Sequence, residues 1–505
     1  MTTLSIPSHL DPVSFAGYAR KLAALLVIAA LADWLFFRQP LGISIAVFLA
    51  ALAVAAVAVN PFRAEATETL TAVAVLVAGL APLAMGTSLL AACFGALATA
   101  YATITIASPE RVGWLARIGR SCWLIIDGSW QGFADIGQTA RRCSQSAIRV
   151  SSLAKWIVPF LLGLIFVVLF ASANPLIEQW ITYLSPGTFL TTLGVPRISF
   201  WLVVSLLIWP FIFIRGLSHF QRHVAHEFRL SVGHIKNDTA AWTSNSILNP
   251  AVVAPSLVIF NLLFAVQTTL DIIYLWGDVA LPNGISYAEY AHRGAYPLLV
   301  TALLAAGFVM MTMRPGSDTE KSRPVRALVF LWTGQNVLLV VSSMLRLDLY
   351  VEMFSLTYLR VAAFIWMALV ATGLMLIATR IALGRTNSWL VKMNFASLAL
   401  VLYICCFVNF PRIIADYNLA HSREATGQGA WLDADYLASL GPQALPALDR
   451  HIERSPTVPV TLIRKRGGLA YRHESEMRNW RAWTYWDAEI ARYLQESRNG
   501  TSWRQ

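Results

Sequence analysis

Eleven long apolar runs constrain what this chain of 505 residues can fold into. Most approach the ~20 residues that a helix needs to cross a bilayer. They cover residues 21–37, 41–59, 70–85, 89–106, 156–173, 198–214, 251–276, 295–311, 327–344, 361–379 and 395–408. The runs are about twice as long as membrane β-strands and lack their alternating pattern. The sequence therefore predicts an all-α, polytopic transmembrane helical bundle of about 11 spans, with an uncertainty of one.

The composition agrees with a membrane protein. Apolar residues make up 57% of the chain and charged residues 13%, against about 25% charge in ordinary soluble domains. This balance excludes a cytosolic enzyme and a disordered chain. The net charge of +11 is explained by basic loops that face anionic lipid, and recognition modules for nucleic acid are not visible. We therefore expect the lipid bilayer to be a partner of the chain, and we expect no nucleic acid partner.

The basic residues predict the orientation. If the N-terminus is cytoplasmic, the inner segments hold 21 of the 39 Lys and Arg residues and the outer loops hold five, while the tail holds the other 13. Short cytoplasmic loops retain Lys and Arg. We therefore expect a bacterial inner-membrane, multi-pass protein with a cytoplasmic N-terminus. An odd number of spans then places the C-terminus in the periplasm.

Four segments are expected along the chain. Residues 1–106 form a four-helix membrane segment, 107–155 a basic amphipathic cytoplasmic segment, 156–408 a seven-helix membrane domain, and 409–505 a small extracytoplasmic helical cap. Within the cap, Gly441 and Pro442 separate two short helices. Further on, Trp483, Trp486, Ile490, Tyr493 and Leu494 recur at helical spacing and predict one apolar face.

Polar groups inside spans are costly, so they mark candidate sites. The intramembrane set is Asp33, Asn261, Gln267, Gln335 and Asn336. The predicted ligand-binding residues, in the outer half and its loops, are Asp271, Glu289, Arg293, Arg346, Asp348, Glu352 and Arg360. Asp271 and Arg346 fall at a similar depth and could meet. The alternative is that these charges pair as salt bridges that hold the helices together.

Catalytic, metal and cofactor motifs are not found. The chain has no glycine-rich phosphate loop, no HExxH and no Gly-x-Ser-x-Gly elbow. His219, His223, His226 and His234 lie in one inner segment, but only Glu227 accompanies them, and a solvated inner loop explains them better than a metal site does. We therefore expect no enzymatic activity, no metal and no cofactor.

Four stretches resemble the uncharacterised bacterial membrane families DUF4173 and DUF4153. They are RLDLYVEMFSLTYLR at 346–360, YAEYAHRG at 287–294, ADWLF at 32–36 followed by PLGIS, and DYLASLG at 435–441. The family pattern often has glycine where Ser355 stands, and this departure implies a slightly looser turn. The resemblance implies a polytopic architecture but no particular reaction.

Two functions agree with these observations. The first is a non-enzymatic sensing or regulatory membrane component, with an outer polar site for a small ligand and a cytoplasmic surface for a signalling protein. The second is a secondary transporter for a small polar or anionic solute, in which Asp271 or Glu289 takes up a proton and Arg346 holds an anion.

Overall fold

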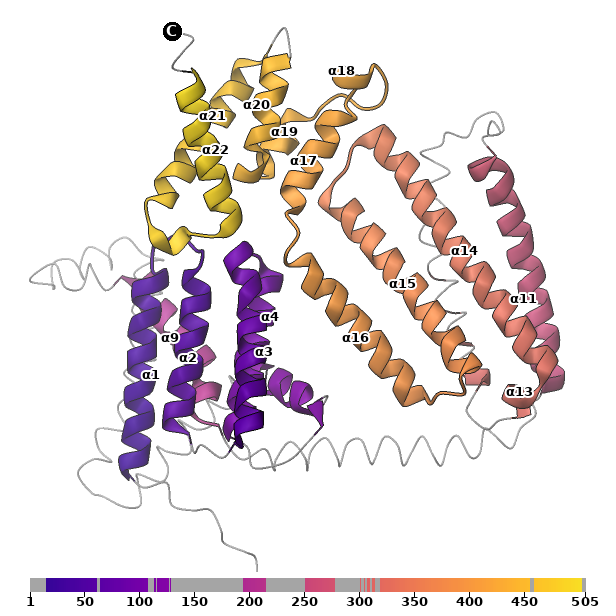
Figure 1. Cartoon of the computed structure of the whole chain (residues 1–505), viewed down its shortest axis with the longest axis horizontal. Coiled ribbons are helices and arrows are strands. Elements are labelled where there is room, and N and C mark those ends of the chain that lie inside the picture. The colour runs from indigo at the N-terminus through magenta and orange to yellow at the C-terminus, as the bar shows by residue number, and fades with distance from the viewer. Residues whose placement is uncertain are drawn as a thin grey trace, which may run out of the picture. The chain divides into compact units, whose positions relative to one another are not determined.

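The computed structural model describes residues 15–60, 64–107, 113–128 without 115 and 127, 194–214, 250–277, several single positions between 300 and 313, 318–454 and 458–501. Every secondary-structure element in these ranges is a helix (Figure 1). The chain divides into two compact units. Unit 1 comprises Met1–His223 and Glu476–Tyr485, and unit 2 comprises Val224–Ser475 and Trp486–Gln505. The four-part division expected from the sequence stays a prediction.

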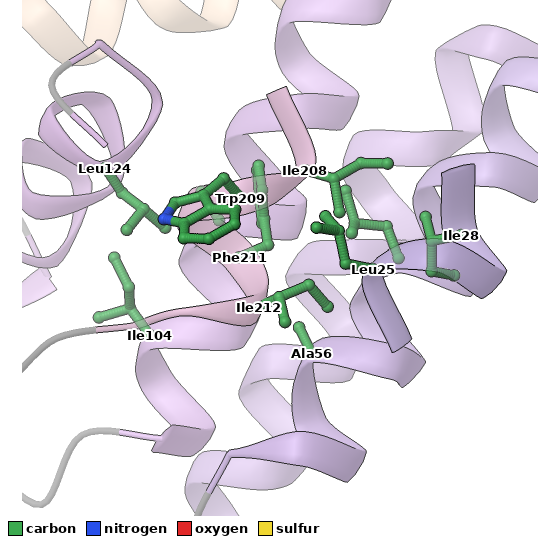
Figure 2. Close-up of a cluster of buried hydrophobic side chains, with 11 residues drawn as sticks. Leu25, Ile28, Ala56, Ile104, Leu124, Ile208, Trp209, Phe211 and Ile212 are labelled. Atoms are coloured by element: carbon green, nitrogen blue, oxygen red, sulfur yellow. The ribbon is translucent and has the colours of Figure 1, made fainter. Parts of the chain in front are cut away.

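The described residues of unit 1 include the long helices α1 (Phe15–Phe36), α2 (Ser44–Val59), α3 (Ala66–Met85), α4 (Leu89–Ala107) and α9 (Val195–Ile212). Residues 116–126 are also helical. Figure 2 shows a core that residues 116–126 share with α1, α2, α4 and α9, with Leu25, Ile104, Leu124 and Trp209 among its buried side chains. The amphipathic segment therefore contributes Leu124 to a protein core in addition to the surface role expected of it.

Small residues bring α3 close to α4. A Cβ atom at Gly79 would overlap the Cβ of Ala98, and one at Gly95 would press on Leu49 of α2. Small residues at helix interfaces let backbones approach closely in membrane bundles, where dispersion contacts replace the hydrophobic effect.

In the part of unit 2 that the structure describes, the apolar helices before the tail are α11 (Pro250–Asp271), α14 (Arg323–Phe354), α15 (Tyr358–Ala382) and α16 (Asn387–Cys405). A π-helical turn, η2 (Ile272–Trp276), follows α11, and the short helix α13 (Asp318–Lys321) precedes α14. Helix α14 packs between α11 and α15, and α15 packs on α16 (Figure 1).

The tail forms short helices. They are α17 (Phe410–Ala420), α18 (Arg423–Thr426), α19 (Ala434–Ser439), η3 (Pro442–Ala444), α20 (Leu445–Arg454), α21 (Val460–Met477), η4 (Trp480–Ala482) and α22 (Tyr485–Thr501). The predicted break at Gly441 and Pro442 lies between α19 and α20, and the predicted apolar face buries Ile490 and Leu494 of α22. Leu356 of the α14–α15 turn and Leu448 of α20 belong to one buried cluster.

Six expected spans are helices long and apolar enough to cross a membrane: α3, α4, residues 251–274, α14, α15 and α16. Two more runs form shorter apolar helices, Ser44–Val59 and Pro196–Ile212. The first run forms the 22-residue helix α1. Run 156–173 and most of 295–311 lie outside the described residues. The chain is therefore a multi-pass membrane protein, while the total of about 11 spans stays a prediction.

Two boundaries differ from the expected ones. Helix α14 continues ten residues past the predicted end at 344, so Asp348 and Glu352 lie on a helix and not in a loop. The prediction was wrong because it ended the span at the charge of Arg346, which is neutralised by an ion pair within the protein. Helix α16 begins earlier, at Asn387, because the side chain of Thr386 caps it by accepting a hydrogen bond from the Trp389 amide.

Candidate functional site

A buried ion pair joins α11 to α14. The Arg346 guanidinium donates from Nη2 to Oδ1 of Asp271, and both residues are buried, with 3% and 0% of their surfaces exposed. Gln267, one turn before Asp271 on α11, donates from Nε2 to the same Oδ1 at 3.0 Å. The structure thus brings together the two charges that the sequence suggested could meet, and it adds Gln267 to them.

The local structure places this pair at a change of helix type. Asp271 is the last α-helical residue of α11, and the five residues that follow form the π-helical turn. Such turns are rare and are frequent at functional sites. Arg346 lies inside the uninterrupted α14, whose long side chains point back toward the helix N-terminus. A polar centre is therefore held by two helices in a region where an isolated charge would be costly.

Asp348 and Glu352 lie one turn apart on α14 and are exposed. Tyr417 of α17 is near them: burial raises the pKa of its phenol, and the negative charges of Asp348 and Glu352 raise it further. The acidic residues of α14 therefore face a tail helix, as a site beneath the tail requires.

Arg360 closes the C-terminal end of α14. Its Nη1 donates to the backbone carbonyls of Phe354 and Ser355, and its guanidinium lies 4.6 Å from the ring centre of Tyr350. A cation at the last carbonyls of a helix is stabilised by the helix dipole. This arrangement gives Arg360 a structural role. The other two predicted ligand-binding residues, Glu289 and Arg293, lie outside the described residues.

The mid-depth amides mostly bind backbone. Asn261 donates from Nδ2 to the carbonyls of Leu257 at 2.7 Å and of Leu328 on α14 at 3.1 Å. Asn336 donates to the carbonyl of Trp332 in its own helix at 2.7 Å. Gln335, next to it, is half-buried. These contacts are typical of polar residues that stabilise helices in a membrane.

An aromatic cluster occupies the interface of α11 and α14 at the level of Trp332. Its ring stacks on Phe260 at 5.4 Å between ring centres and meets Phe264 and Phe308 edge-on at 6.0 Å each. Trp332 is buried. Phe264 and Trp332 each precede the polar pair along their own helix, so the interface changes from aromatic to polar toward Asp271.

Asp33 has a separate setting in unit 1. Its carboxylate accepts two hydrogen bonds from Arg197 of α9, at 2.9 Å from Nε and 2.5 Å from Nη2. The indole of Trp201 donates a third at 2.9 Å. A bidentate pair of this kind is a strong, oriented contact. Asp33 therefore fixes α1 to α9, a role that matches the salt-bridge alternative.

Two buried polar groups were not among the predicted site residues. Asn418 of α17 binds both backbone groups of Leu356, and the sequence contains no motif that could have revealed it. Arg380 of α15 has none of its surface exposed, and a basic residue near the end of an apolar run was a visible signal. The residues that the structure describes contain no group of three His, Cys, Asp or Glu that could hold a metal ion. The histidine-containing segment lies outside them.

Comparison with protein families identifies one match. The model of the family described as "Domain of unknown function (DUF4153)" matches residues 22–451. The chain belongs to this family. The resemblance to DUF4153 seen in the sequence is thereby confirmed, while DUF4173 is not shown. The matched region includes the buried pair and Asn418, and it ends within α20. No curated protein and no solved structure matches the chain.

Proposed function

We propose that the protein is a non-enzymatic sensing or regulatory membrane component that binds a small polar or anionic ligand around Asp271 and Arg346. The observation that carries the proposal is the buried ion pair at the end of α11. Breaking a buried pair leaves an uncompensated charge and is strongly unfavourable. A ligand that replaces one partner would therefore change how α11 packs on α14, and this is the response that a sensor needs.

The aromatic cluster favours sensing over transport. A transporter needs a polar path through the bilayer, whereas Trp332, Phe260, Phe264 and Phe308 fill the interface below the pair with rings. Asn336, between the rings and the pair along α14, donates to its own helix. On the far side of these rings, Asn261 donates to the backbone carbonyls of Leu257 and Leu328. The ring layer thus separates the Asp271–Arg346 pair from that amide, which supports a site that opens on one side only.

The second candidate is a secondary transporter for a small polar or anionic solute. It is favoured by the row of polar residues on α14, in which Thr333, Asn336, Ser342, Ser343 and Arg346 are all buried. In this proposal Asp271 takes up a proton and Arg346 holds the anion. The aromatic rings would then have to move during each transport cycle.

Contacts of the tail support the proposed sidedness. The carbonyl of Trp483 accepts a hydrogen bond from the Ile43 amide at 2.9 Å, and Asn479 donates to the side chain of Gln39 at 2.7 Å. We infer that the α1–α2 turn and residues 479–483 lie on the same side of the membrane. With α1 proposed as a span, this contact supports a cytoplasmic N-terminus and a periplasmic tail in the bacterial inner membrane. A cytoplasmic signalling partner then requires transmission across the bilayer.

A flux assay separates the two functions. The full chain is reconstituted in liposomes that contain a pH-sensitive dye, and acetate, phosphate and glycine are added outside as probe solutes. The sensor proposal expects no protein-dependent solute or proton flux. Flux in the wild type that Asp271→Asn abolishes would overturn it in favour of transport. Asp416→Asn, which alters an exposed ion pair with Arg450, is the matched control.

A binding experiment tests the sensor directly. Hydrogen exchange of the amides in α11 and α14 is measured with and without each probe solute. The sensor proposal expects at least one probe to change exchange around Asp271 and Arg346, and it expects Arg346→Gln to remove that change. If none of the probes alters exchange in the wild type, the site is not one for small anions or amino acids.

A further inference from the structure

Arg380 is a buried cation whose hydrogen bonds are incomplete. It lies in the last turn of α15 and has 0% of its surface exposed. Nη2 donates to the carbonyl of Met313 at 2.8 Å. Nε and Nη1 have no hydrogen-bond partner in the described part of the chain. A buried guanidinium with unused donors is costly, and such groups in native proteins usually meet a water or an ion.

A second arginine, Arg326 of α14, contacts the last turn of α15. Arg326, in the first turns of α14, donates from Nη2 to the carbonyl of Ile381, the residue after Arg380, at 3.4 Å. Val325 and Ile381 also belong to one buried cluster with Met313. The last turn of α15, which carries Arg380, therefore lies beside the N-terminal turn of α14, where backbone N–H groups and the helix dipole favour an anion.

The surrounding charges are predominantly positive. Lys321 at the end of α13, Arg323 at the start of α14 and Arg385 just after α15 are exposed. The Glu320 carboxylate of α13 acts electrostatically on Arg380. Among the side chains that the structure describes here, the cations outnumber this carboxylate, and an anion would offset the excess of positive charge.

We propose that this end of α14 and α15 binds a phosphate-type anion, with Arg380 on its inner side and Arg326 at its edge. Arginine suits phosphate because its planar fork can make two parallel hydrogen bonds. The position suits it too, because α15 ends at Ala382 and basic pockets at the ends of spans bind lipid head groups. The phosphate can belong to an anionic lipid or be free in solution. The site is independent of the proposed sensing site.

The test measures the melting temperature of the full chain in neutral detergent. One series adds sodium phosphate against sodium chloride at equal ionic strength, and the other adds phosphatidylglycerol against phosphatidylcholine. A ligand that binds the folded state raises the melting temperature. Stabilisation by phosphatidylglycerol alone identifies a lipid head group, and stabilisation by inorganic phosphate identifies a free anion. If neither stabilises the wild type, the proposal is overturned.

Variants locate the site. We expect Arg326→Gln and Arg380→Gln to raise the ligand concentration at half-effect about tenfold, equivalent to ~1.4 kcal/mol. Arg385→Gln, an exposed cation near the same end, should change it less than about twofold if Arg326 and Arg380 hold the anion. Equal losses in all three variants would indicate general attraction and overturn the proposal. If Arg380→Gln does not fold, Arg326→Gln decides, because the side-chain hydrogen bond that it removes, to the carbonyl of Ile381, is long at 3.4 Å.

Discussion

Asn418 binds the backbone of Leu356 from both sides. Its Oδ1 accepts the Leu356 amide at 2.6 Å, and its Nδ2 donates to the Leu356 carbonyl at 2.9 Å. Asn418 is buried on α17, and Leu356 is buried in the turn between α14 and α15. One side chain thus satisfies both polar backbone groups of a residue in a turn and joins the tail to the end of two membrane helices.

Replacing Asn418 by alanine should detach the tail from this turn. A buried donor and a buried acceptor would each lose a partner, at about 1–3 kcal/mol each. We expect a lower melting temperature and faster proteolysis of the tail. Asn394→Ala is the control, because that half-buried amide donates only to the carbonyl of its own helix, at Leu390. Equal losses in the two variants would show that the contact with Leu356 has no special importance.

Ser355, the residue before Leu356, has a strained backbone. Its φ is +67° and its ψ is 165°, a region that is nearly restricted to glycine. Ser355→Gly should stabilise the protein by about 1 kcal/mol, since the relief of strain exceeds the entropy cost of glycine. Ser439→Gly, at an ordinary helical position in α19, should instead destabilise. A lower melting temperature for Ser355→Gly would contradict this interpretation.

The Asp271–Arg346 pair should show strong coupling. Arg346→Met alone should lower stability by about 3–5 kcal/mol, because it removes the positive charge that faces the buried carboxylate of Asp271. The double variant Asp271→Leu, Arg346→Met should regain most of this loss. Thermal unfolding of the four proteins gives the coupling energy. The exposed pair of Asp416 and Arg450 should couple by less than about 1 kcal/mol. Additive losses at Asp271 and Arg346 would disprove the pairing.

Gly42 should control the docking of residues 479–483 on the α1–α2 turn. A Cβ atom there would overlap the backbone of Arg481 and Ala482, so Gly42→Ala should displace that segment. The measurement is disulfide formation between cysteines placed at Gln39 and Asn479, which hydrogen-bond to each other. Gly334→Ala, where a Cβ atom meets nothing within 4 Å, should leave the cross-link unchanged. Unchanged cross-linking in Gly42→Ala would contradict the close approach.

Ionisation of the Tyr493 phenol on α22 should lower the stability of the tail at high pH. Burial, and next the carboxylate of Asp449, which accepts its hydrogen bond at 2.9 Å, raise the pKa of this phenol to about 12. The folded state therefore binds this proton more tightly than the unfolded state, whose tyrosine titrates near pH 10. Its contribution is complete below about pH 10 and is lost as the pH rises toward 12.

The measurement is the Cζ resonance of labelled tyrosine, which is assigned by its absence in Tyr493→Phe. A titration midpoint near pH 10 would show that neither burial nor Asp449 raises the pKa of Tyr493. Tyr493→Phe should also show a shallower decrease in stability between pH 10 and 12, because this variant has no phenol to ionise.

Hydrophobicity determined much of the fold from the sequence alone. Runs near 20 apolar residues have few alternatives to a helix when no water can satisfy the backbone, and six of the eleven runs form such helices. The Gly441–Pro442 pair likewise predicted a break between two tail helices. The helical spacing from Trp483 to Leu494 predicted the apolar face of the last one. These are local signals, encoded within a few turns of the residues that they affect.

Only the tertiary structure decided which polar side chains contact each other. Gln267, Asp271 and Arg346 were visible as polar residues at similar depth, but only packing of α11 on α14 made one carboxylate the acceptor of both donors. The binding of Leu356 by Asn418, 62 residues away, follows from no local pattern. Side-chain contacts between distant elements depend on how the helices cross and pack, which short-range periodicity does not specify.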